Sequence, residues 1–183
     1  LLSNAKKLIK LAKKSGFDYV KLQTYEAKTM TLNCKKNEFV IKKGLWKKKT
    51  LWNLYSKAQT PFSWQKELFN FCAKIKIKCF STPFDETAVD LLEKLNCPIY
   101  KIASFEINHI PLIEKVSKTK KPIIISTGMA TIKDIDLAYD TAYKNGSREI
   151  ILLYCISNYP AQNSDFNLRS IEFLKTRYKC QFA

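Results

Sequence analysis

The chain has 183 residues, of which 46% are apolar, which is enough for one hydrophobic core and excludes a disordered protein. No apolar run is long enough to cross a bilayer, and the lysines that closely follow Leu1 and Leu2 argue against a signal peptide. The formal charge is +16, but Arg148, Arg169 and Arg177 are the only arginines among 32 basic residues. Solvated lysine faces therefore explain the charge better than a specific nucleic-acid surface.

Short apolar strands alternate with amphipathic helices along the chain. A first helix, with apolar residues at 5, 8, 9 and 12, is expected to end at Gly16. A long connection over 26–62 contains a short helix at 51–58, and its lysine-rich run at 42–49 is the best candidate for an acidic partner. Strands are predicted at 18–24, 77–81, 99–103, 122–126 and 150–154, and further helices at 63–76, 86–95, 110–119, 132–144 and 168–178.

This alternation predicts an α/β fold with a parallel sheet buried on both faces. A doubly wound sheet and a β/α barrel both fit, but the chain has only four glycines and no G-x-G-x-x-G turn of a dinucleotide fold. Polar residues at the ends of five successive strands favour the barrel. Because eight strands are needed to close one, we interpret residues 1–183 as an incomplete (β/α)8 TIM barrel.

The six cysteines form no C-x-x-C pair, and several fall within predicted strands or helices. This distribution is typical of reduced core thiols rather than of a disulfide framework. It predicts a cytoplasmic protein.

The strand ends predict one anion-binding site. Lys21 and Gln23 lie two apart on a strand, so both should point to the same face, into the barrel mouth. Lys101 repeats this pattern with Ser104 just beyond it, and an inward lysine implies an anionic partner. Three further strand ends carry neutral hydroxyls, those of Thr82, Ser126 and Ser157. Together with the lysines they suit a small molecule that bears phosphate and carboxylate.

At these residues the chain resembles a known family, the sialic acid synthases, which are phosphoenolpyruvate-dependent nonulosonic acid synthases. The resemblance runs from Ala5 to about Tyr178. Within the family, the GLW and LWNLYSKAQTPFSW stretches are most similar to pseudaminic acid synthases. The segments that carry the resemblance are AKKLIKLAKKSGFDYVKLQTY, FSTPFDETAVDLLEKL, YKIASFE, KPIIISTGMAT and the C-x-S-x-YP element at 155–160.

The resemblance implies a β/α barrel. It also implies an enzyme that condenses phosphoenolpyruvate, through its enolpyruvate carbon, with an open-chain N-acetylated amino sugar and releases phosphate. It implies a divalent metal, Mn²⁺ or Mg²⁺, that activates the sugar aldehyde. A homodimer is expected for the full-length protein, with no specific nucleic-acid or membrane partner. The family's C-terminal antifreeze-like domain is expected to be absent from this chain.

The resemblance also implies roles for individual residues. Lys21, Thr82 and Lys101 would hold the carboxylate and phosphate of phosphoenolpyruvate, with the two lysines serving catalysis. Ser104, Ser126 and Ser157 would complete the phosphate site, although Asn158 is an alternative to Ser157 because many relatives place Asn at this strand. The sugar side would be lined by Gln23, Phe84, Glu106 and Tyr159, of which Phe84 and Tyr159 could equally be packing residues.

Two departures from the family pattern limit these expectations. The family's first-strand glutamate would lie before Leu1, and its metal-binding histidines would lie beyond Ala183. No metal ligand is therefore assigned here, and residues 1–183 alone are expected to be inactive. Two other interpretations stay open, another phosphoenolpyruvate aldolase of the Kdo-phosphate or DAHP synthase type and a basic RNA-binding protein.

Overall fold

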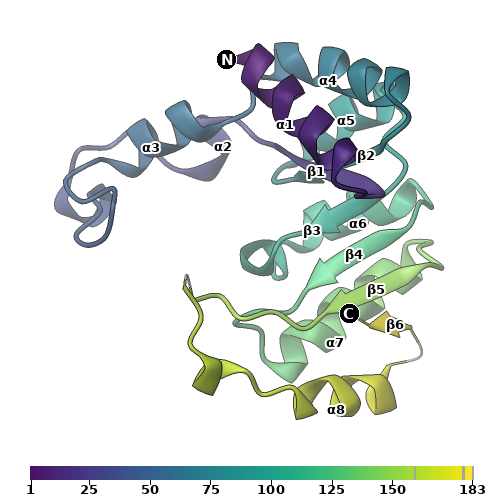
Figure 1. The fold of residues 1–183 in the computed structure, drawn as a ribbon. Coiled ribbons are helices and arrows are strands. Elements are labelled where there is room, and N and C mark those ends of the chain that lie inside the picture. The colour runs from purple at the N-terminus through teal and green to yellow at the C-terminus, as the bar shows by residue number, and fades with distance from the viewer. Residues whose placement is uncertain (159, 179, 183) are drawn as a thin grey trace. The chain divides into compact units, whose positions relative to one another are not determined.

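The computed structural model describes residues 1–158, 160–178 and 180–182, and the chain forms two compact units, Leu1–Asn96 and Cys97–Ala183. Figure 1 shows strands and helices alternating in both units. In order, unit 1 contains α1 (Leu2–Lys14), β1 (Tyr19–Thr24), α2 (Ala27–Met30), the 3-10 helix η1 (Asn37–Phe39), α3 (Leu51–Ala58), α4 (Phe62–Lys74), β2 (Lys78–Pro83) and α5 (Glu86–Lys94).

The two strands of unit 1 run parallel, with Lys21 opposite Phe80 and Gln23 opposite Thr82. One face of this pair packs on the helices, because Val20 and Leu22 lie against the buried cluster that includes residues of α1, α4 and β2. Side chains alternate along a strand. Lys21 and Gln23 therefore share the face that points away from the helices, as the sequence predicted.

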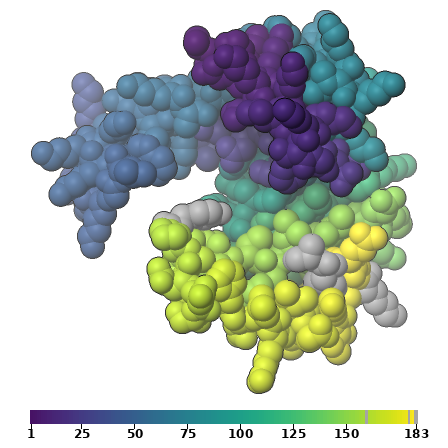
Figure 2. All heavy atoms as spheres, in the orientation of Figure 1, coloured from purple at the N-terminus to yellow at the C-terminus, as the bar shows by residue number. Residues whose placement is uncertain are grey.

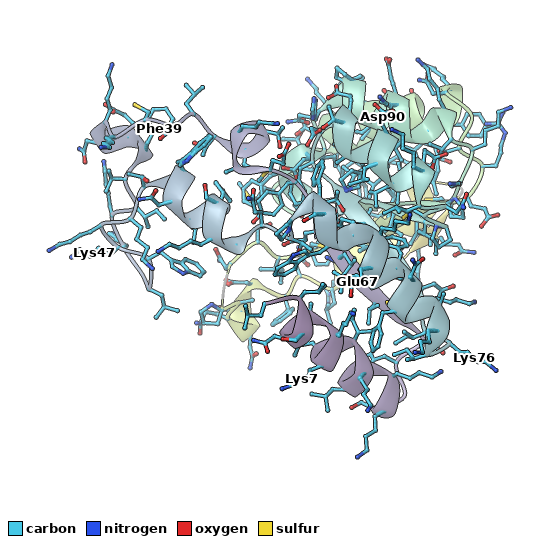
Figure 3. The ribbon with its side chains drawn as sticks, turned by 90° about the horizontal axis from the view of Figure 1, so that it is seen from above. Lys7, Phe39, Lys47, Glu67, Lys76 and Asp90 are labelled. Carbon is cyan, nitrogen blue, oxygen red and sulfur yellow. The ribbon has the colours of Figure 1, made fainter. Side chains whose placement is uncertain are left out.

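A long excursion separates β1 from α4 and contains the basic run. Val40 and Thr50 form an isolated antiparallel bridge, and the residues between positions 42 and 49 are all exposed. Thr50 also begins α3, because its side chain accepts a hydrogen bond from the backbone N–H of Asn53 at 3.2 Å. The excursion stands away from α1 in Figure 2, and Phe39 and Lys47 mark it in Figure 3. The short α2 was not predicted.

Unit 2 is a parallel sheet in which each strand pairs with the next one along the chain. Ile102, Ile125 and Leu152 stand side by side on adjacent strands and are fully buried. In order, the elements are β3 (Tyr100–Ile102), η2 (Ser104–Glu106), α6 (Ile110–Lys118), β4 (Ile123–Ser126), α7 (Ile132–Lys144), β5 (Ile150–Leu153), η3 (Asn163–Asp165), α8 (Arg169–Arg177) and β6 (Gln181–Phe182). Helices α6 and α7 lie behind the strands in Figure 1.

The backbone confirms the predicted helix stop at Gly16, and a second glycine ends α7. Gly16 follows α1 with φ +84°, and Gly146 follows α7 with φ +111°, a left-handed conformation that glycine adopts without steric cost. Helix α7 begins with a capping box, in which Thr131 accepts from the N–H of Asp134 and the Asp134 carboxylate accepts from the N–H of Thr131. The capping box at Thr131 fixes the end of the loop that follows β4.

All five predicted strands are confirmed, and the strand β6 is an addition to them. It was missed because two residues give no readable periodicity, and it is defined by its pairing with Ile151 and Leu152 of β5. None of the six cysteines forms a disulfide, and Cys72, Cys79 and Cys97 are buried. None of the helices in the described part of the chain has both the length and the apolar character needed to span a bilayer.

Helices α7 and α8 are joined by a polar cluster that should make unit 2 sensitive to acid. The guanidinium of Arg177 donates to both carboxylate oxygens of Asp136, at 2.9 and 2.6 Å, and the hydroxyl of Tyr178 donates to Asp136 at 2.7 Å. These hydrogen bonds, first that from Arg177, hold the pKa of Asp136 below its ordinary value. A carboxylate with a lowered folded-state pKa stabilises the fold above its unfolded pKa of about 3.9, and this contribution is lost as the pH falls further.

We therefore expect Asp136→Asn to lower the free energy of unfolding by about 1 kcal/mol at pH 7 and by much less near pH 3. Chemical denaturation of the wild-type protein and of the Asp136→Asn variant at both pH values measures this difference in the free energy of unfolding. Asp140→Asn is the matched control, because Asp140 forms an exposed ion pair with Lys144 at 3.7 Å on the same helix. An equal loss of stability in Asp136→Asn at pH 7 and at pH 3 would contradict the link between the lowered pKa of Asp136 and the stability of the fold.

Candidate functional site

Two serine hydroxyls converge on a glycine at the strand ends of unit 2. A Cβ atom added to Gly128 would lie 2.5 Å from Oγ of Ser157, 2.8 Å from Oγ of Ser104 and 3.2 Å from the carbonyl oxygen of Cys155. These contacts leave no room for a side chain at position 128. We call Ser104, Gly128 and Ser157, which follow β3, β4 and β5 respectively, the hydroxyl cradle.

Backbone hydrogen bonds hold the middle loop of the cradle in place. The N–H and the hydroxyl of Thr127 both donate to the carbonyl oxygen of Leu153, at 3.0 and 2.9 Å, and so fix this loop against the end of β5. The N–H of Ala130 donates to the carbonyl oxygen of Thr127 at 3.2 Å and closes a turn around Gly128 and Met129. The position of Gly128 is thus set by the sheet.

Ser126 brings a buried hydroxyl to the same strand end. It is the last residue of β4 and is 1% exposed, and its Oγ has no hydrogen-bond partner among the described residues. An unsatisfied buried hydroxyl costs about 1–3 kcal/mol, and a bound oxyanion could satisfy it. Ser126 is two residues from Ile124, which is paired with Lys101, so it shares a sheet face with this lysine.

Lys101 of β3 and Glu106 of η2 interact electrostatically at the start of unit 2. Burial raises the pKa of Glu106, while the positive charge of Lys101 acts in the opposite direction. The Oε2 atom of Glu106 is buried and has no partner among the described residues. A carboxyl group with a raised pKa beside an ammonium group is a frequent feature of active sites.

The site residues predicted in unit 1 share one face of the β1–β2 pair. Lys21 and Gln23 are exposed rather than enclosed, although partial burial lowers the pKa of Lys21. Thr82, opposite Gln23, is 1% exposed, and its Oγ1 has no hydrogen-bond partner in the described part of the chain. Gln65 of α4 donates to the carbonyl oxygen of Gln23 at 3.3 Å and supports the end of β1.

The structure distinguishes between some of the alternatives left open by the sequence. Phe84 is 9% exposed, and its ring packs edge-on against Tyr25 with a centroid distance of 5.3 Å, which favours packing over sugar contact. Ser157 faces the cradle, whereas exposed Asn158 donates to Asp165 at 3.2 Å. Tyr159 lies outside the described residues.

The described residues do not form a metal centre by themselves. Within 1–158, 160–178 and 180–182, no three His, Cys, Asp or Glu side chains lie together as possible ligands. The side-chain donors of the hydroxyl cradle are neutral hydroxyls, which suit an oxyanion better than a cation.

Comparison with known proteins gives a family model and individual relatives that agree with one another. A family model described as the NeuB family matches residues 8–182. The chain is 47% identical over 182 residues to a pseudaminic acid synthase of Helicobacter pylori, covering 100% of the chain and 54% of that protein. It is 39% identical over 181 residues to an N,N'-diacetyllegionaminic acid synthase of Campylobacter jejuni, covering 97% of the chain and 54% of that protein.

A solved structure is similar over the same region. The crystal structure of an N-acetylneuraminic acid synthetase from Leptospira borgpetersenii superposes with a TM-score of 0.86 at 28% identity, and the match covers 100% of this chain and 59% of that one. The chain thus spans about half the length of the curated relatives that it matches. Its α/β elements correspond to part of the fold of such synthetases.

Proposed function

Because the chain belongs to the NeuB family, we propose that this protein condenses phosphoenolpyruvate with an N-acetylated amino sugar to form a nonulosonic acid. The hydroxyl cradle is the observation that carries the proposal, since the absence of a side chain at Gly128 lets the hydroxyls of Ser104 and Ser157 converge at the strand ends, where they can donate to one oxyanion. The relatives named for pseudaminic, legionaminic and N-acetylneuraminic acid synthesis support this reaction class. The 47% identity to a pseudaminic acid synthase favours the pseudaminic type.

The chemistry divides between carbon–carbon bond formation and loss of phosphate. The enol carbon of phosphoenolpyruvate attacks the aldehyde carbon of the open-chain sugar, and water adds to the cationic carbon that carries the phosphate. Cleavage of that carbon–oxygen bond then releases inorganic phosphate. The water oxygen stays on that carbon, one of its protons ends on the former aldehyde oxygen and the other leaves with the phosphate, so that the nonulosonic acid and hydrogen phosphate account for every atom.

The residues of unit 2 have two tasks in this reaction. Ser104, Ser126 and Ser157 donate hydrogen bonds to the phosphate oxygens, and the ammonium group of Lys101 balances the anionic charge. Glu106, with its raised pKa, accepts a hydrogen bond from the sugar. The roles of Lys21, Gln23 and Thr82 stay as predicted from the resemblance.

A divalent cation, Mn²⁺ or Mg²⁺, would supply Lewis-acid activation of the sugar aldehyde when bound. The described residues do not provide a group of three possible ligands for it, and the roles assigned above are those of the chain's own side chains. The homodimer also stays a prediction.

The reaction predicts that inorganic phosphate is released only when both substrates are present. We expect the full-length protein to bind phosphoenolpyruvate in calorimetry and to release phosphate after an N-acetylated amino sugar is added. Colorimetric phosphate detection and mass spectrometry of the sugar acid measure this. Phosphate release that does not depend on the sugar, or the absence of phosphoenolpyruvate binding, would contradict the proposal.

A further inference from the structure

Two apolar side chains stand exposed in the loops that form the hydroxyl cradle. Phe105 and Met129 are each 72% exposed, more than any other large hydrophobic side chain described in unit 2. Phe105 lies between Ser104 and Glu106 in η2, and Met129 directly follows Gly128. Because Oγ of Ser104 lies 2.8 Å from the position of a Cβ on Gly128, the two loops meet beside these residues.

The backbone of Met129 makes its exposure more informative. Its φ of +66° is left-handed, a conformation that costs a side-chain-bearing residue about 1–2 kcal/mol and glycine almost nothing. An apolar side chain in a strained turn and in contact with solvent is unfavourable for stability alone. Such strain is concentrated at functional sites.

Neither side chain can donate a hydrogen bond to a polar ligand. A phenyl ring and a thioether instead favour contact with a methyl group, and they leave a hydroxyl in the same place without a partner. The ligand group that they suit is therefore small and apolar, and it belongs to a ligand bound next to the hydroxyl cradle, as the acceptor that reacts with the cradle's ligand must be.

We propose that Phe105 and Met129 form an apolar rim that contacts the methyl of the N-acyl group of the sugar and selects against a hydroxylated acyl group. The apolar rim rests on the proposed function, because it identifies the acceptor of that same reaction. Its occupant is the acyl methyl of the sugar.

The test uses the full-length protein and one sugar in two forms, N-acetyl and N-hydroxyacetyl. Phe105→Ser removes the ring, and Met129→Gly removes the side chain while keeping a residue that tolerates the left-handed turn. We expect each variant to raise KM for the N-acetyl sugar by about tenfold and to leave KM for the N-hydroxyacetyl sugar nearly unchanged. The affinity for phosphoenolpyruvate, measured by calorimetry, should stay within about twofold of the wild-type value.

Phe173→Ser is the matched control, because Phe173 is 52% exposed on α8 and lies outside the candidate site. It should leave both KM values unchanged. An equal rise in both KM values, or no change in either, would overturn the apolar rim, and so would a changed oligomeric state with unchanged KM, which would make these residues a protein interface.

The two proposals fail in different ways. A wild-type protein that neither binds phosphoenolpyruvate nor condenses it with any sugar would overturn the proposed function and the apolar rim together. A wild-type protein with normal activity whose variants keep the wild-type preference between the two sugars would overturn the apolar rim alone.

Discussion

Gly128→Ala is expected to weaken phosphoenolpyruvate binding by roughly a hundred- to ten-thousandfold while the fold is retained. The added methyl would lie 2.5 and 2.8 Å from the hydroxyl oxygens of Ser157 and Ser104, so both hydroxyls must rotate away. Each lost hydrogen bond to a charged group contributes about 1.5–3 kcal/mol, and two are lost together. Because the clashing atoms are the ends of rotatable side chains, the sheet itself can keep its structure. Calorimetry and thermal melting of the full-length variant measure the two effects.

A multiple-mutant cycle shows whether Gly128 acts through the two serines. Ser104→Ala with Ser157→Ala removes both hydroxyls, so adding Gly128→Ala to this pair should weaken binding little further. A fully additive loss would mean that the methyl group blocks the ligand directly or distorts the loop. Wild-type affinity in Gly128→Ala would contradict the role of the hydroxyl cradle in binding.

Lys101→Met is expected to weaken phosphoenolpyruvate binding by roughly ten- to a hundredfold, because it removes charge-assisted hydrogen bonds and keeps the length of the side chain. The substitution also removes the positive charge that opposes the raised pKa of Glu106. The pKa of Glu106 should therefore rise further, and the acidic limb of the pH–rate profile should move to higher pH. Calorimetry and the pH dependence of kcat/KM measure these changes.

Lys133→Met is the control for general loss of positive charge, since Lys133 is exposed in the first turn of α7. It should change phosphoenolpyruvate affinity by less than about twofold. If both variants weakened binding equally, Lys101 would act only through net charge. If the acidic limb of the pH–rate profile were unchanged in Lys101→Met, the ionisation of Glu106 would have no role in catalysis.

The sequence was sufficient to predict the repeating elements and the family. Periodicity and the glycine stops located the helices and strands, and the order of motifs identified the resemblance to the sialic acid synthases, which the comparisons confirm. That Lys21 and Gln23 share one face of the sheet also followed from strand geometry alone. Their roles as ligands stay predictions.

Other features depend on distances across the fold. The importance of Gly128 becomes visible only when the loops after β3 and β5 are both placed against it, and a glycine after a hydroxyl is a weak signal by itself. Spacing alone could not decide between Ser157 and Asn158, because the hydrogen bond from Asn158 to Asp165 depends on the turn at η3. The packing of Phe84 on Tyr25 likewise joins elements that are far apart in sequence.

The order of pairing in unit 2 has a consequence for how the site forms during synthesis. Each strand pairs with the next one along the chain, so the three loops of the hydroxyl cradle are brought together by contacts of limited sequence separation. Pairing between consecutive strands closes shorter loops than pairing between distant strands and so costs less entropy, and chains fold progressively as they leave the ribosome. We expect the phosphate-binding part of the molecule to become ordered soon after β5 and Ser157 have been translated, before the residues that follow them take part in folding.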